Sequence, residues 1–167
     1  MSTILVDNIN EKTSSNGVLI PGHVVQVVQF VYPTYEQISS SSYTATGLTQ
    51  SITPKSTSSK ILVNISVNTG NSGANAAENA FALYRSIGGG SASAIETFER
   101  AIFAYDPGGQ NIHVDANIFL SLLDTPNTTS ATTYTLYGKT DAGQLRFNDH
   151  IVSGQGQSTI TLMEIAQ

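Results

Sequence analysis

Cysteine and tryptophan are absent from this 167-residue chain, and charged residues are scarce. Without cysteine the chain has no disulfides, no thiolate metal ligands and no cysteine nucleophile. Asp, Glu, Lys and Arg make up 11% of the residues, whereas about 25% is usual in a soluble domain. The length fits a single domain, which is large enough to hold a hydrophobic core without covalent cross-links.

The small number of charges also excludes classes of partner. The net charge is −5 and the seven Lys and Arg residues are dispersed, so nucleic acid is not an expected partner. No segment approaches the roughly 20 apolar residues that a membrane helix needs, so we expect no membrane insertion. The N-terminus shows no basic region followed by an apolar run, so we expect assembly inside a cell and release on lysis, not secretion.

Hydroxyl and amide side chains are abundant instead, and in two segments apolar and polar residues alternate along the sequence with a period of two. Ser and Thr number 39 and Asn adds 12, a composition that suits half-exposed strands. In residues 112–122, alternate positions are apolar, and the intervening ones are polar except for Phe119. Residues 60–68 repeat the pattern. Such strands bury one face in an antiparallel sheet.

The rest of the chain predicts further short strands separated by turns. Strands are expected at 43–48, 51–54, 79–86, 132–139, 145–151 and 158–165, with a loop at 69–79 and a hairpin turn at 141–143. Residues 91–105 are ambiguous: the spacing of Ile95, Phe98, Ile102 and Tyr105 fits a helix, but the neighbouring segments favour a strand pair or a short helical turn. The sequence therefore predicts an all-β fold, an antiparallel β-sandwich resembling a jelly roll, over residues 23–167.

Residues 1–22 are expected to form a separate docking segment. Its apolar side chains lie on either side of a turn signal at residues 14–17, which includes an Asn-Gly pair. Two short strands around a turn bury little on their own, so the segment needs a partner surface, unless it is simply a frayed terminus. The docking residues would be Ile4, Val6, Ile9, Val18 and Ile20.

Residues 24–32 are apolar on both faces of an extended strand, which predicts that the strand is covered on both sides. The second cover would be another subunit, contacted through Val24, Val28, Phe30 and Tyr32. The alternative is a central strand beneath a loop of the same chain.

The sequence carries no strong catalytic motif. Gly88, Gly89 and Gly90 lack the Lys that follows in a phosphate-binding loop, and residues 153–156 lack the order of a nucleophile elbow. His113 and Asp115 share the wet face of their strand as a weak metal or acid–base pair, and Asp149 with His150 is a second. We therefore expect no enzyme, no cofactor and no metal.

Tyrosines near strand ends provide an alternative function. Tyr35, Tyr43 and Tyr105 are expected near loops, where an aromatic ring can stack on a sugar. They are candidate contacts for a host-surface glycan, as in a lectin-like receptor-binding tip.

Three segments resemble virion proteins of tailed bacteriophages, especially marine and cyanobacterial ones: residues 1–9, 54–63 and 159–165. The expected strand order also resembles the trimeric jelly-roll heads of complement-like and tumour-necrosis-factor-like proteins. The resemblance implies a homotrimer on the virion surface, bound to other capsid or tail proteins. It would be a capsid decoration, a head fibre or a short tail fibre that is made in the host cytoplasm and attaches to the host.

Overall fold

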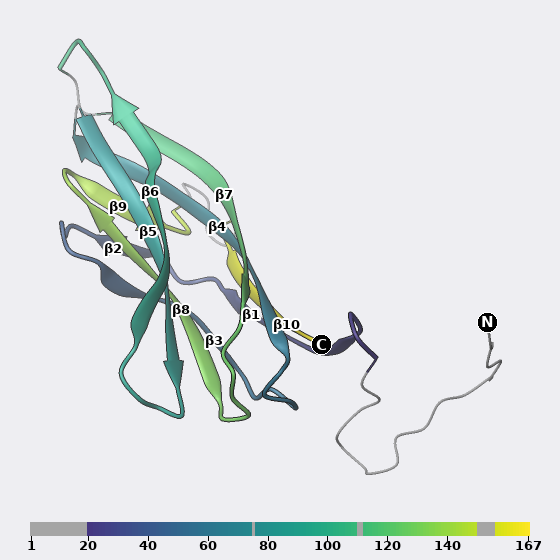
Figure 1. The fold of residues 1–167 in the computed structure, drawn as a ribbon. Coiled ribbons are helices and arrows are strands. Elements are labelled where there is room, and N and C mark those ends of the chain that lie inside the picture. The colour runs from purple at the N-terminus through teal and green to yellow at the C-terminus, as the bar shows by residue number, and fades with distance from the viewer. Residues whose placement is uncertain (1–19, 75, 110–111, 150–155) are drawn as a thin grey trace.

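The structure is a computed structural model that describes residues 20–74, 76–109, 112–149 and 156–167. These residues form ten β-strands packed as an antiparallel β-sandwich, which confirms the predicted fold class (Figure 1). Within the described ranges, no helix is long and apolar enough to cross a membrane. The strands are β1 (Val24–Tyr32), β2 (Glu36–Ile38), β3 (Thr44–Ile52), β4 (Lys60–Ala74), β5 (Ala76–Ile87), β6 (Ser93–Tyr105), β7 (Ile112–Asp124), β8 (Thr132–Thr140), β9 (Gln144–Phe147) and β10 (Ser158–Ile165).

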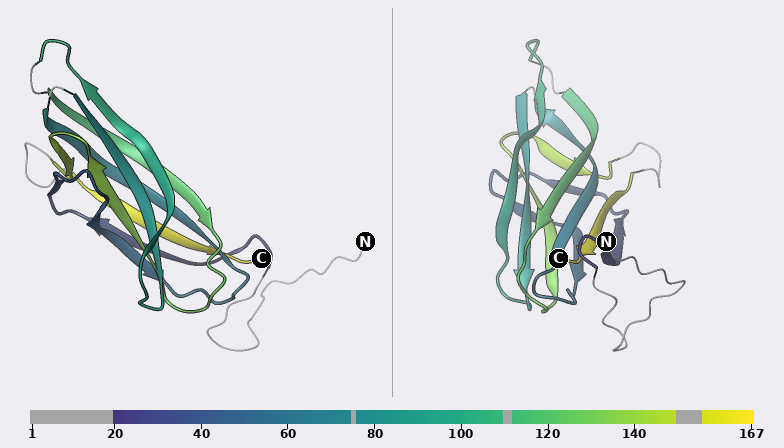
Figure 2. Two further views of the ribbon diagram at one scale, coloured as in Figure 1. Left: turned by 60° about the vertical axis from the view of Figure 1, so that its left-hand side comes forward. Right: turned by 45° about the vertical axis from the view of Figure 1, so that its right-hand side comes forward.

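Two sheets lie face to face, and the long strands run along the length of the molecule (Figure 2). The six-stranded sheet, sheet A, has the order β1-β10-β4-β9-β2, with β7 paired to the other side of β4. The four-stranded sheet, sheet B, has the order β3-β8-β5-β6. Because β10 and β9 pair with successive parts of β4, the main strands are ordered β1-β10-β4-β7 opposite β3-β8-β5-β6, which is a jelly-roll order.

The core lies between the sheets and consists of the alternate residues that the period of two predicts. Ile61, Val63, Ile65 and Val67 of β4 are all buried, while their neighbours in sequence are half-buried on the outer face. The rings of Phe81 in sheet B and Phe147 in sheet A meet edge to face, with centroids 5.8 Å apart. Burying each such side chain contributes roughly 1.5–3 kcal/mol, so hydrophobic burial dominates the stability.

The loop predicted at residues 69–79 is wrong, because β4 continues to Ala74 and β5 begins at Ala76. The Gly- and Asn-rich sequence has low strand propensity, but this end of β4 is paired with β7 on one side and β9 on the other. The buried amide of Asn71 donates to Asn79 Oδ1 at 3.2 Å. Pairing on both sides therefore outweighs local propensity here.

Two other segments each form one strand where more were predicted. β3 is one strand that covers most of the two short strands predicted at 43–48 and 51–54, with a register irregularity between Ala45 and Thr49. β6 replaces the strand pair or helical turn predicted at 91–105. Two register shifts in its pairing with β5 place Ile95, Phe98 and Ala101 against the core. A bulge adds one residue to the strand repeat, so a spacing of three on a bulged strand resembles a helix.

The turn at residues 141–143 is present, but it does not close a hairpin. β8 belongs to sheet B and β9 to sheet A, so the turn carries the chain from one sheet to the other.

β1 also differs from its prediction. It lies at an edge of sheet A, which excludes the central strand beneath a loop, and in the single chain Val27 and Val31 on its outer side are exposed.

Candidate interaction surfaces

The outer face of sheet A carries a row of apolar side chains that crosses four strands. The register aligns Val27 of β1 with Met163 of β10, Leu62 of β4 and Leu123 of β7. Val27 is 53% exposed and Leu123 is 50% exposed, while the two central residues are half-buried. Directly opposed side chains lie about 5 Å apart, so the row forms a continuous apolar stripe.

Two further rows extend the same face without adding a charge. The next row is joined by side-chain hydrogen bonds: the Gln29 amide donates to Thr161 Oγ1, and the Ser121 hydroxyl donates to Asn64 Oδ1, both at 2.8 Å. The third row ends at Phe119, which is 81% exposed. The twelve residues of the three rows, which we call face A, are Val27, Met163, Leu62, Leu123, Gln29, Thr161, Asn64, Ser121, Val31, Thr159, Ser66 and Phe119.

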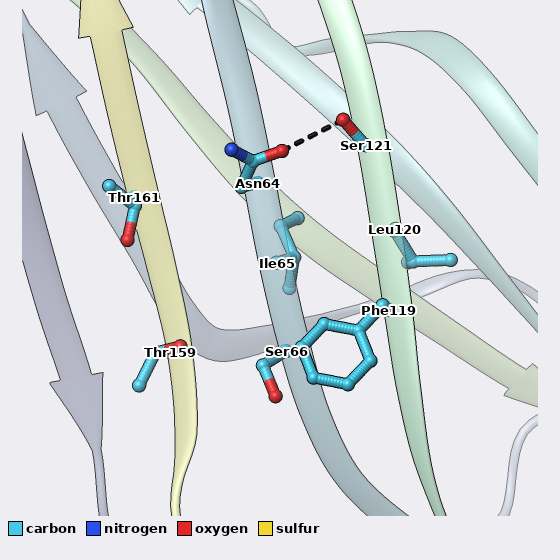
Figure 3. Close-up of a pocket in the computed structure, with 8 residues that line it drawn as sticks. All are labelled: Asn64, Ile65, Ser66, Phe119, Leu120, Ser121, Thr159 and Thr161. Carbon is cyan, nitrogen blue, oxygen red and sulfur yellow. Dashed lines mark hydrogen bonds between the residues drawn. The ribbon is translucent and has the colours of Figure 1, made fainter.

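A hollow of about 330 Å³ opens within face A beside Phe119 (Figure 3). It forms because the short side chains of Ser66 and Thr159 stand in the same row as the large phenylalanine ring. Ile65 and Leu120 lie at its base, and hydroxyl and amide groups surround it. The sequence marked this position, since Phe119 is the apolar exception on a polar strand face.

Of the predicted docking residues, only Ile20 lies within the described residues, where it is exposed. Ile4, Val6, Ile9 and Val18 lie outside the described residues. Gly22 donates its backbone N–H to Ala166 O at 2.8 Å, so the described chain begins against its own C-terminal strand. Docking by residues 1–22 stays a prediction.

The four predicted interface residues of β1 do not all lie on one surface. Val28 and Tyr32 pack against the core of their own chain, and the Phe30 ring lies 6.2 Å from the Tyr32 ring. Val24 pairs with Ile165 and is exposed. A bulge between Val24 and Gln26 explains the difference, because it moves the following residues to the opposite face. A subunit contact through these residues stays a prediction.

The outer face of sheet B is aromatic and charged. The rings of Tyr84 and Tyr137 stack with centroids 3.8 Å apart, and the Tyr43 ring lies 6.5 Å from Tyr84. The Tyr43 hydroxyl donates to Glu99 Oε1 at 2.7 Å, and Lys139 Nζ lies 4.5 Å from the centre of the Tyr43 ring. Of these aromatic residues, the sequence singled out Tyr43 alone. The pairing of β5 with β8 brings the other two tyrosines together.

The hydrogen bond between Tyr43 and Glu99 also shifts the pKa of both side chains. Burial, together with the hydrogen bond and charge of Glu99, raises the pKa of Tyr43 well above its ordinary value. The hydrogen bonds from Tyr43 and Lys139 lower the pKa of the Glu99 carboxyl. Tyrosine therefore stays protonated and glutamate stays ionised, so the pair is a fixed donor and acceptor and not an acid–base couple near neutral pH.

The other two candidate glycan contacts lie elsewhere on the molecule. Tyr35 precedes β2, is exposed, and donates its hydroxyl to Gln37 Oε1 at 2.8 Å. Tyr105 ends β6, is 62% exposed and stacks beside Phe103. Tyr43 and Tyr105 belong to the side of the sandwich formed by sheet B, whereas Tyr35 leads into a strand of sheet A. Their contact with a glycan stays a prediction.

The two weak ionisable pairs of the sequence contribute to one cluster. His113 Nε2 lies 3.1 Å from Asp115 Oδ1 and 3.7 Å from Asp149 Oδ2, while His150 lies outside the described residues. β4 brings them together because it pairs with both β7 and β9. The sequence did not indicate Arg146, whose guanidinium contacts His113 and forms an ion pair with Asp149.

The cluster is a poor match for a metal ion, although its three ligand atoms lie within 4.8 Å of one another. Arg146 Nη2 also lies 3.5 Å from Asp115 Oδ1, so the guanidinium already holds both carboxylates. Its side chain is largely buried. A cation placed among these ligands would lie beside a fixed positive charge, which opposes its binding. We interpret the cluster as an ion-pair network that fastens β9 to β7.

No protein-family model matches the sequence, and no curated protein matches it. Among solved structures, the chain is similar to one in the "Structure of infectious bursal disease virus Gx strain", with 12% sequence identity and a TM-score of 0.36. The match covers 84% of this chain and 36% of that chain, so this protein spans about a third of the length of its structural neighbour. A likeness at this level does not bear on function.

Proposed function

We propose that this protein is a non-enzymatic structural subunit of a virion surface and that copies of it assemble through face A. The observation that carries the proposal is that the twelve side chains of face A include no charged residue. Each copy carries a net charge of −5, so copies repel one another unless they meet where the charges are absent. An uncharged sheet face with exposed Phe119 and Leu123 is such a place.

The size of face A is compatible with this role. Four strands about 4.8 Å apart and three rows about 7 Å apart span roughly 400 Å². The flanking rows add Val24 with Ile165 on one side and Asn68 with Asn117 on the other, which brings the area to about 530 Å². The first of these rows continues to Lys60 at the border of the face. A standard protein interface buries about 800 Å² on each partner. The face therefore supplies most of one contact, and the edge of β1 extends it.

The virion setting comes from the sequence resemblance, and two of the three resembling segments contribute residues to this face. Residues 54–63 lead into β4, and residues 159–165 are part of β10, its antiparallel neighbour. Leu62, Thr159, Thr161 and Met163 of face A belong to them. A capsid decoration, a head fibre or a short tail fibre, with three copies anchored by residues 1–22, is the assembly that the resemblance implies.

The first test is the mass of the full-length protein in solution. We expect a trimer that Leu123→Asp converts to monomer, because the substitution places a carboxylate on an exposed apolar residue of the contact. Thr133→Asp, on the outer face of sheet B, makes the same change in charge elsewhere and should leave the mass unchanged. A wild-type monomer at every concentration, or a Leu123→Asp variant that stays trimeric, contradicts assembly through face A.

The second test concerns the anchor. A protein that lacks residues 1–22 should keep its oligomeric state and fail to enter particles. If the shortened protein is incorporated at the normal copy number, those residues do not anchor it.

A further inference from the structure

Two aromatic rings with nearly parallel planes project from β6 near the far end of the sandwich. The rings of Phe103 and Tyr105 have centroids 6.4 Å apart and planes only 8° from parallel. Phe103 is 51% exposed, and Tyr105 is more exposed still. Residues two apart on a strand point to the same side, so the two rings form one exposed aromatic surface, which we call the platform. Exposed aromatic rings bury apolar area when a partner with an apolar face covers them.

A guanidinium group supports the platform from one side. Arg100 Cζ lies 4.7 Å from the centre of the Phe103 ring, and its Nη2 forms an ion pair with Glu78 at 3.2 Å. Arg100 adopts a φ of +53°, in the left-handed region that non-glycine residues rarely occupy. Arg100 lies in the irregularity between the pairs that Asn79 and Phe81 form with β6, so the bulge holds this conformation in place.

A polar hollow of about 160 Å³ adjoins the platform. Glu78 lies directly across the β5–β6 ladder from Phe103, so the hollow and the platform share the outer face of sheet B. In a chain with so few charges, five charged side chains gather here, together with Ser41 and Thr140: Glu78, Glu99, Arg100, Lys139 and Asp141.

Both cations of the hollow are already paired. Lys139 contacts Glu99 at 3.1 Å, and Arg100 contacts Glu78. Each carboxylate still has lone pairs to accept further hydrogen bonds, because a carboxylate offers about four acceptor sites. The hollow therefore offers acceptors for hydroxyl donors beside a surface suited to a flat apolar face.

We propose that the Phe103–Tyr105 platform and this hollow together bind a neutral pyranose oligosaccharide. A pyranose presents an apolar C–H face to the aromatic rings and hydroxyl groups to the carboxylates and the guanidinium. Nucleobases also stack on aromatic platforms. Phosphodiesters, however, would meet three carboxylates with no unpaired cation among the lining residues, which opposes nucleic acid. Acidic sugars are disfavoured for the same reason. The site is independent of face A, which lies on the other sheet.

The test uses the full-length protein on a panel of immobilised neutral hexose and N-acetylhexosamine oligosaccharides with matched sialylated forms. We expect binding to neutral members. The soluble form of the best neutral oligosaccharide is then titrated against the protein in solution. Tyr105→Ser should weaken binding about tenfold through loss of stacking, whereas Tyr105→Phe should keep it. Tyr35→Ser removes another exposed tyrosine elsewhere and should have no effect.

Three outcomes overturn the proposal. In the first, the protein binds no neutral oligosaccharide above background. In the second, it binds the sialylated forms better than the neutral ones. The third is equal weakening by Tyr105→Ser and Tyr35→Ser. Because Tyr105 lies on the surface, its serine variant should fold normally, and an unchanged thermal midpoint checks this. The Leu123→Asp protein should retain the affinity of each site, so failure of assembly and failure of glycan binding are distinguishable.

Discussion

The Tyr134 hydroxyl donates to Asp124 Oδ2 at 2.7 Å, and this hydrogen bond joins the two sheets. Tyr134 is completely buried in β8 of sheet B, whereas Asp124 is the last residue of β7 in sheet A. Arg85 of β5 donates to both oxygens of the same carboxylate at 2.8 Å. One carboxylate thus receives three hydrogen bonds from the opposite sheet.

Tyr134→Phe should lower the free energy of unfolding by about 1.5–3 kcal/mol, because it removes a buried hydrogen bond to a charged acceptor. Denaturant unfolding measures the effect. Tyr137→Phe removes the same atom from a half-buried ring on the outer face of sheet B and should cost less. Equal losses in the two variants would show that the hydrogen bond to Asp124 contributes little.

Alkaline pH should destabilise the fold. Burial, helped by the hydrogen bond and charge of Asp124, raises the pKa of Tyr134 far above the unfolded value near 10. Burial and Glu36 likewise raise the pKa of Tyr32 to about 12. The unfolded chain therefore loses its tyrosine protons first. This stabilising contribution is fully present below about pH 10 and declines as pH rises toward the folded pKa values.

Unfolding measured between about pH 8 and 11 tests this dependence. The free energy of unfolding should be level at first and then fall, and Tyr134→Phe should make the fall shallower. A wild-type curve that stays level to the highest pH would contradict the assigned pKa directions.

Glu164→Gln should destabilise the protein although it barely changes the size of the side chain. The buried Glu164 carboxylate accepts hydrogen bonds from Gln26 Nε2 at 2.6 Å and from the Lys55 backbone N–H at 2.7 Å. An amide replaces one acceptor oxygen with a donor, which then faces another donor. We expect a loss of about 1–3 kcal/mol in thermal or denaturant unfolding. Glu96→Gln on the exposed part of β6 is the control, and a similar loss there would refute the explanation.

Added Zn²⁺ should not raise the thermal midpoint of the wild-type protein through the His113 cluster, because the Arg146 guanidinium already holds the carboxylates. Arg146→Met removes that charge and should create a weak metal-dependent stabilisation. Thermal unfolding with Zn²⁺ and with a chelator measures both. A wild-type midpoint that Zn²⁺ raises and His113→Ala abolishes would show that the cluster is a metal site after all.

The sequence predicted the strands whose burial alternates and missed those governed by pairing or bulges. Residues 60–68 and 112–122 follow a period of two because one face of each strand meets the core. Residues 69–74 become strand only because β7 and β9 flank them, which no local pattern encodes. The spacing of Ile95 and Phe98 mimics a helix because β6 is bulged.

The sequence also predicted single residues of the candidate surfaces but not the surfaces themselves. Phe119 and Tyr105 were visible as single residues, since each is an aromatic residue in a polar or loop context. Face A needed the register of four strands, which brings together residues more than 130 positions apart. The cluster of His113 with Asp149 needed β4 as a shared neighbour. Long-range pairing, not composition, assembles these surfaces.

The backbone contact between Gly22 and Ala166 fixes where the described chain enters and leaves the sandwich. Both points lie at one corner, and the 106–109 turn lies at the opposite end of the long axis (Figures 1 and 2). A partner protein that binds the first residues of the chain would therefore leave that turn, and the rings of β6 beside it, facing away from the partner and accessible to another molecule. A bulky fusion after Gln167 would lie at the same corner, so a purification tag there would hinder binding through the first residues of the chain.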